Sequence, residues 1–165
     1  MPEHIRWDAK YTYVFWRPIT AIRLASTDGN PATTDDPAWT PLLVTPNFPE
    51  YPSGHATVSP AAAGVLGTYF GNAVEFTLTS ETLPGVVRTY ASFTQAADEA
   101  FDARIYGGIH FRSACRDGRA LGTQVGSFVM VNVAQSGHGK RKGQIKHDHP
   151  SGDIGGDGES TGNDQ

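Results

Sequence analysis

The chain has 165 residues, 38% of them hydrophobic, and its 13 lysines and arginines against 17 aspartates and glutamates give a formal net charge of −4. This length suits one domain with one core, and the acidic balance gives no indication of nucleic-acid binding. No apolar run approaches the roughly 18–20 residues of a membrane span, and no secretory signal is visible. The single cysteine, Cys115, excludes an internal disulfide and a cysteine-based zinc site. We therefore expect a soluble protein and leave its compartment unknown.

The first third of the sequence predicts a helix followed by a long loop. Residues 3–25 have a helical pattern, with Pro18 as the point where the helix kinks or breaks. Residues 26–52 carry six prolines and predict a loop. Long ordered loops tend to be functional.

The rest of the ordered chain predicts three helices. They span residues 55–70, 92–106 and 113–134, and Gly107-Gly108 interrupts the pattern between the last two. We find no convincing strand and no internal repeat. The predicted fold class is all-α, a helical bundle.

Two regions of different composition divide the chain. Residues 1–135 form the predicted helical domain. Residues 136–165 are rich in glycine and charge, and they predict a disordered tail because so few apolar groups cannot offset the entropy of ordering.

The stretch YPSGHAT, residues 51–57, places Ser53, Gly54 and His55 at the start of a predicted helix. The first turn of a helix leaves backbone N–H groups unpaired and carries partial positive charge. Ser53 can donate its hydroxyl, Gly54 lets an anion approach the backbone, and His55 adds a proton donor or acceptor. The structural alternative is an ordinary serine N-cap beside a surface histidine.

Lys10 and Arg17 are seven residues apart and would lie nearly on one line of a continuous helix. Both could then reach one ligand, and the planar guanidinium suits oxyanions. The alternative is a solvated basic edge. The apolar residues 13–16 between the two cations favour burial instead, and buried cations need an anionic partner.

Arg104 and His110 are six residues apart, about 120° from each other on an unbroken helix, so they converge only if Gly107-Gly108 breaks it. Each also has a structural interpretation. Arg104 could pair with Asp98 or Glu99, and His110 could be a hydrogen-bonded core histidine.

Together these residues are suited to a multiply charged tetrahedral oxyanion, and the two histidines add the means to attack and to protonate. Carboxylates are absent from the three stretches, which argues against divalent-metal catalysis.

Three motifs now resemble a known superfamily, that of the type 2 phosphatidic acid phosphatases (PAP2) and vanadium haloperoxidases. Its motifs are Lys-x6-Arg-Pro, Pro-Ser-Gly-His and Ser-Arg-x5-His-x3-Asp. The chain has KYTYVFWRP at residues 10–18, PSGH at residues 52–55 and ARIYGGIHFRSA at residues 103–114. The context FPEYPSGHAT, residues 48–57, is similar to the soluble haloperoxidases, and the resemblance implies their C-terminal part, without the N-terminal helices of longer relatives.

The resemblance also implies residue roles. The residues that bind the oxyanion, vanadate or phosphate, would be Lys10, Arg17, Ser53, Gly54 and Arg104. His110 would be the axial ligand of vanadium and His55 the acid–base, which makes these two the catalytic residues. The cofactor would be vanadate, and the enzyme would be a peroxidase that oxidises halide with hydrogen peroxide.

The same pocket fits two other activities. In a soluble acid phosphatase His110 would form a phosphohistidine with a phosphate ester, His55 would protonate the leaving alcohol, and no cofactor would be needed. Vanadate resembles the phosphoryl-transfer transition state, so the motifs do not separate the two enzymes. The third possibility is a non-catalytic remnant that only binds an oxyanion.

The chain departs from the superfamily pattern at two positions. Ala103 replaces a serine, and Ala114 replaces the aspartate that orients the histidine. We expect Ser113 or a backbone carbonyl to orient His110 instead. Exposed apolar helix faces in such a short bundle would also favour a homo-oligomer.

Overall fold

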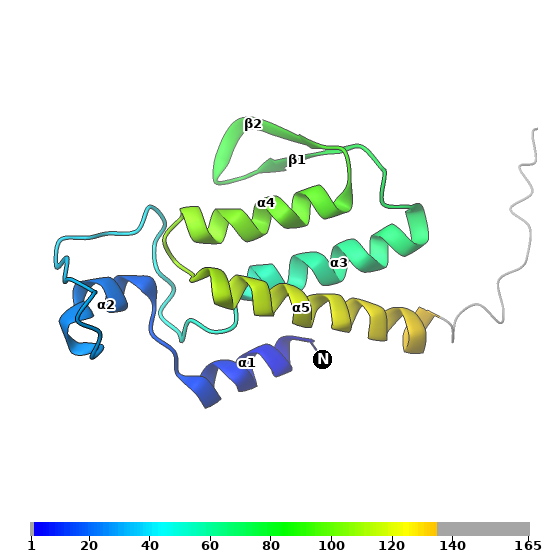
Figure 1. Cartoon of the computed structure of the whole chain (residues 1–165). Helices are drawn as coiled ribbons and strands as arrows, with labels where there is room; N and C mark the ends of the chain where they lie inside the picture. The colour runs from blue at the N-terminus through cyan, green and yellow to red at the C-terminus, as the bar shows by residue number, and fades with distance from the viewer. Residues whose placement is uncertain (1, 135–165) are drawn as a thin grey trace, which may run out of the picture.

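The computed structural model describes residues 2–134, which form a helical bundle with one small sheet (Figure 1). In chain order the elements are α1 (Pro2–Tyr13), α2 (Pro18–Arg23), the 3-10 turn η1 (Ala25–Thr27), α3 (Gly54–Phe70), β1 (Phe76–Ser80), β2 (Leu83–Tyr90), α4 (Phe93–Tyr106), α5 (Arg112–Val129) and the π-helical turn η2 (Met130–Ala134). No helix in this part of the chain is long and apolar enough to cross a membrane. The predicted disordered tail, residues 136–165, lies outside the described residues.

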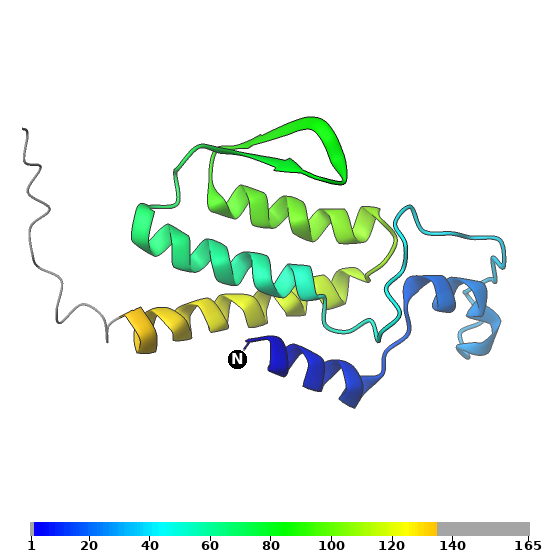
Figure 2. The ribbon, with the colours of Figure 1, turned by 180° about the vertical axis from the view of Figure 1, so that it is seen from behind.

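The bundle consists of α3, α4 and α5. α3 packs against α4 and α5, and the two opposite views show the three helices side by side (Figures 1 and 2). Gly118, Gly122 and Gly126 lie four residues apart on α5 and face the backbone of α3. A Cβ atom at Gly122 would overlap the carbonyl oxygen of Thr57, so glycine there permits the close approach of the two helices.

A small buried core lies under the first turn of α3. Ala56, Phe101 and Cys115 contribute one side chain from each helix of the bundle, and Ile105 packs against them. Many other large apolar side chains are exposed, among them Phe128. The prediction of self-association stays a prediction.

An antiparallel hairpin over α4 corrects the all-α prediction (Figure 1). Phe76 of β1 is opposite Tyr90 of β2, and the Phe76 ring also packs on Phe93 with 5.3 Å between centroids. Pro84 and Gly85 favoured a loop in the sequence. They lie near the start of β2 in a two-stranded sheet, where both strands are edges and a proline is tolerated.

The predicted helix over residues 3–25 is two helices. α1 ends at Tyr13, Val14 adopts a φ of +44°, and Pro18 begins α2 at a position that suits proline. The predicted break at Pro18 is confirmed. The expectation that residues 13–16 are buried is wrong, because Tyr13, Val14, Phe15 and Trp16 are all exposed.

Candidate functional site

The start of α3 is buried and fixed by hydrogen bonds of Ser53. Its hydroxyl oxygen accepts a long hydrogen bond from the Ala56 N–H at 3.5 Å, which confirms the N-cap. The Ser53 N–H donates to the Ala114 carbonyl at 3.1 Å, and the Ser53 carbonyl accepts from Thr57 Oγ1 at 2.8 Å. Ser53 and Gly54 are both buried. Ala114 therefore holds the start of α3 through its backbone carbonyl, and its side chain takes no part in this hydrogen bond.

Lys10 fixes the loop that leads into α3. Its Nζ donates to the carbonyls of Pro49, Glu50 and Pro52 at 2.9, 3.0 and 2.8 Å. Lys10 is only 1% exposed, so it is not part of a solvated basic edge.

Arg17 meets the same loop from the start of α2. Its Nε donates to the Phe48 carbonyl at 3.1 Å, and its Nη1 lies 2.8 Å from the Ile109 carbonyl and 3.1 Å from His110 Nε2. Lys10 and Arg17 both lie about 5 Å from the centre of the Phe48 ring, a cation–π arrangement. The two cations thus converge as predicted, although not along one helix: the loop between α1 and α2 brings them together.

His110 is buried and bonded at both ring nitrogens. Nδ1 lies 2.7 Å from Oε1 of Glu50, and the same oxygen accepts the Phe111 N–H at 2.9 Å. Burial lowers the pKa of His110 more than the hydrogen bond to Glu50 raises it, so the ring is neutral at neutral pH.

Glu50 is the site residue that sequence reasoning missed. The expectation that Ser113 or a backbone carbonyl orients His110 is wrong, since this carboxylate does so. A signal was present, because Glu50 is the only carboxylate in FPEYPSGHAT and lies three residues before Ser53.

Arg104 lies near the end of α4, and its carbonyl accepts hydrogen bonds from the N–H groups of Ile109 and His110, both at 3.3 Å. Gly108 has a φ of +71°, which confirms that the Gly107-Gly108 pair breaks the helix and turns His110 back.

The carboxylates suggested as partners of Arg104 are bonded elsewhere. Asp98 pairs with Arg119 at 2.8 Å, and Glu99 pairs with Arg88 at 2.7 Å. Arg104 borders a cavity of about 640 Å³ between α3, α4 and the hairpin.

Hydrogen bonds are incomplete in this region. Among the side chains that the structure describes, four buried atoms have no hydrogen-bond partner: Arg17 Nη2, Thr45 Oγ1, Glu50 Oε2 and Arg104 Nε. A buried donor without an acceptor costs about 1–3 kcal/mol, and more when it is charged. Burial lowers the pKa of both arginines for the same reason, the loss of hydration. Unpaired guanidinium donors of this kind could donate to the oxygens of an oxyanion.

The remaining sequence-predicted residue, His55, is placed differently. It is exposed in the first turn of α3, directly after Gly54. Its side chain therefore lies at the solvent side of the helix start, while His110 lies below in the buried cluster.

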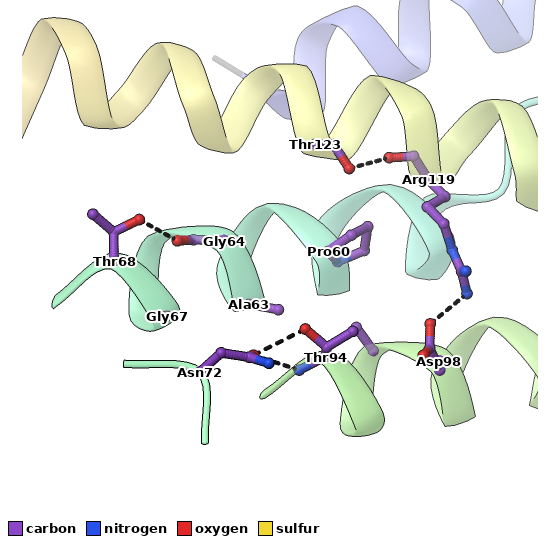
Figure 3. Close-up of a pocket in the computed structure, with 11 residues that line it drawn as sticks. Pro60, Ala63, Gly64, Gly67, Thr68, Asn72, Thr94, Asp98, Arg119 and Thr123 are labelled. Carbon is purple, nitrogen blue, oxygen red and sulfur yellow. Dashed lines mark hydrogen bonds and ion pairs between the residues drawn. The ribbon is translucent and has the colours of Figure 1, made fainter. Parts of the chain in front are cut away.

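A second polar region lies between α3, α4 and α5 (Figure 3). This pocket of about 390 Å³ contains the Asp98–Arg119 ion pair, and the Asn72 side-chain oxygen accepts from both the N–H and the hydroxyl of Thr94. None of the four unpartnered atoms of residues 2–134 belongs to its lining.

The fold and the site together define a class of protein, a helical bundle with a buried arginine, a buried histidine and a serine-capped helix start. The model of the VCPO second helical-bundle domain matches residues 3–139, and the chain belongs to this family.

Individual relatives agree with this assignment. The chain is 35% identical over 78 residues to the vanadium chloroperoxidase of Curvularia inaequalis, an alignment that covers 41% of this chain and 12% of that protein. It is similar to the crystal structure of the first bacterial vanadium-dependent iodoperoxidase, with 41% identity, a TM-score of 0.69 and coverage of 79% of this chain and 30% of that one. An apo-type bacterial vanadium-dependent chloroperoxidase, at 23% identity and a TM-score of 0.66, shares the fold over 81% of this chain and 34% of its own. The chain thus spans about a third or less of the relatives that it matches.

Proposed function

We propose that this chain forms the vanadate-binding site of a haloperoxidase that oxidises halide with hydrogen peroxide. The observation that carries the proposal is the pair of buried, unpartnered donors, Arg17 Nη2 on the arginine that contacts His110 and Arg104 Nε near the end of α4. Membership of the vanadium chloroperoxidase domain family supports vanadate as the oxyanion.

Several residues of this chain would bind the oxyanion, by hydrogen bonds and by positive charge. Arg17 and Arg104 would donate to its oxygens, and the Ser53 hydroxyl and the Gly54 N–H at the helix start would add neutral donors. Lys10 would contribute positive charge while it holds the loop carbonyls. His110 would ligate the vanadium through Nε2. Bound vanadate supplies a Lewis-acidic centre for the oxidation.

His55 would act as the acid–base in this proposal. Its exposure at the helix start lets its ring exchange protons with solvent. Replacing His55 with alanine should therefore cripple turnover and leave oxyanion binding nearly intact. If His55→Ala instead abolishes binding, His55 is a ligand and the assignment is wrong.

The test is bromide and iodide oxidation by hydrogen peroxide with the purified chain, with and without orthovanadate, beside hydrolysis of p-nitrophenyl phosphate. We expect vanadate-dependent halide oxidation that His110→Ala abolishes and Arg119→Met, in the second pocket, retains. Phosphate-ester hydrolysis inhibited by vanadate would replace the proposal with the acid phosphatase. Oxyanion binding with neither activity would leave only the binding remnant.

A further inference from the structure

The Glu50 carboxylate is one of the most buried polar groups of the described chain. Glu50 is 0% exposed, and Oε1 accepts from both the His110 ring and the Phe111 N–H. Its backbone is fixed as well, because its N–H donates to the Phe15 carbonyl at 3.0 Å and its carbonyl accepts from Lys10. Oε1 and both backbone groups of Glu50 are therefore held, which leaves the carboxylate little freedom to move away from the histidine.

The two partners of His110 select one tautomer. Oε1 of Glu50 accepts the Phe111 N–H and lies 2.7 Å from Nδ1, which places the ring proton at Nδ1, facing Glu50. A guanidinium only donates, so Nε2, 3.1 Å from Arg17 Nη1, must carry the lone pair. Both contacts require the same arrangement, in which Nε2 carries no proton and its lone pair could exchange the Arg17 N–H for an electrophilic centre.

In the superfamily pattern, an aspartate orients the histidine. Its position in this chain is occupied by Ala114, which is 0% exposed in α5. Its carbonyl accepts the Ser53 N–H, which binds α5 tightly to the start of α3. The carboxylate beside His110 comes instead from the loop that precedes α3.

We propose that Glu50 is the positioning residue of His110, which holds the ring as the Nδ1–H tautomer and replaces the aspartate missing at Ala114. This inference rests on the proposed function, in which His110 bonds the oxyanion centre through Nε2. Outer carboxylates of this kind typically change metal affinity or activity by about 10–100-fold.

The first experiment reads the tautomer directly, in the full chain without vanadate. Ring nitrogens of ¹⁵N-histidine-labelled protein are observed by NMR, with His110→Ala to assign the signals. We expect a protonated Nδ1 and an unprotonated Nε2 in the wild type, and in Glu50→Ala a shifted Nδ1–H signal with faster proton exchange, because Arg17 alone then holds the tautomer. Glu99→Ala, which removes another partly buried glutamate, should leave the His110 signals unchanged. Unchanged His110 signals in folded Glu50→Ala would overturn the proposal.

The second experiment compares orthovanadate with inorganic phosphate, because only the former is expected to bond the histidine in the resting protein. For Glu50→Gln, which keeps the shape and removes the charge, we expect vanadate affinity to fall about 10-fold or more while phosphate affinity stays within about threefold. Equal losses for both anions would show that Glu50 only supports the loop. Glu50→Gln also decides the matter if Glu50→Ala does not fold. If the wild type binds neither anion, the proposed function fails, and the tautomer still tests Glu50.

Discussion

Two polar regions of this molecule differ in how their hydrogen bonds are completed. In the pocket between α3, α4 and α5, Arg119 is paired with Asp98, and Thr94 donates to Asn72 (Figure 3). In the cluster around His110, Arg17 and Arg104 each keep a buried donor without a partner. The polar groups of the pocket satisfy one another, whereas the cluster keeps buried donors for the oxyanion that we propose it binds. An open volume is therefore a weaker indication of function here than an unpaired buried charge.

The largest expected effect tests how the loop beside the cluster is held. Lys10→Met keeps the length of the side chain and leaves the carbonyls of Pro49, Glu50 and Pro52 without this donor. Because each buried polar group left unsatisfied costs about 1–3 kcal/mol, the free energy of unfolding should fall by about 3 kcal/mol or more. Urea denaturation measures this change. Arg119→Met in the pocket, where the pair is about half exposed, should cost less than about 1 kcal/mol. Similar losses in both variants would contradict the account.

A smaller change in stability tests the contact between α3 and α5, which the two polar regions share. Gly122→Ala would force its Cβ into the Thr57 carbonyl, and such overpacking costs about 1–3 kcal/mol. Gly64→Ala is the matched control on the pocket side of α3, where an added Cβ has no neighbour within 4 Å. It should stabilise the protein by about 0.5–1 kcal/mol, because alanine is the better helix former. Equal melting temperatures for the two variants would show that α3 and α5 are not in close contact.

The smallest expected effect concerns the hairpin side of α4, where the charges are paired and exposed. The hydrogen bond from Arg88 lowers the pKa of Glu99 below its ordinary value of 4.5. A depressed carboxyl pKa stabilises the fold above the unfolded pKa, and this contribution is lost as the pH falls through the folded pKa. The free energy of unfolding of the wild type should therefore exceed that of Glu99→Gln by less than about 1 kcal/mol at pH 7, and the difference should shrink as the pH falls below 4.5 and through the lowered pKa. Unfolding curves at several pH values measure it, and a difference that grows in acid would refute the sign.

Much of the bundle was predictable because its signals are local. The helix over residues 55–70 begins within one residue of α3, and the helix over residues 92–106 within one residue of α4, since a serine N-cap precedes each. The break at Gly107-Gly108 was predictable from the flexibility of glycine. The hairpin was missed because Pro84 and Gly85 usually indicate a loop, and only the pairing with β1 makes a strand of them.

The site was predictable in its cations and its histidine but not in its carboxylate. Lys10 and Arg17 were placed together for the wrong reason, since one helix was expected where the chain turns at Val14. Glu50 contacts a histidine 60 residues away along the chain, and periodicity carries no information about a contact at that separation. The three motifs were informative because each marks the positions of particular cations and histidines in the sequence. The hydrogen bond between Glu50 and His110 depends instead on how the loop and the bundle pack together.

The most direct test of the central claim, that the cluster binds an oxyanion and the pocket does not, is a calorimetric titration of orthovanadate into Arg104→Met and Arg119→Met. Both variants remove one positive charge from neighbouring helices, so the long-range electrostatic change is similar. A charged hydrogen bond is worth about 1.5–3 kcal/mol, so we predict that Arg104→Met binds vanadate about 10–100-fold more weakly and that Arg119→Met binds it like the wild type. Equal affinities for the two variants, or a loss confined to Arg119→Met, would contradict the account.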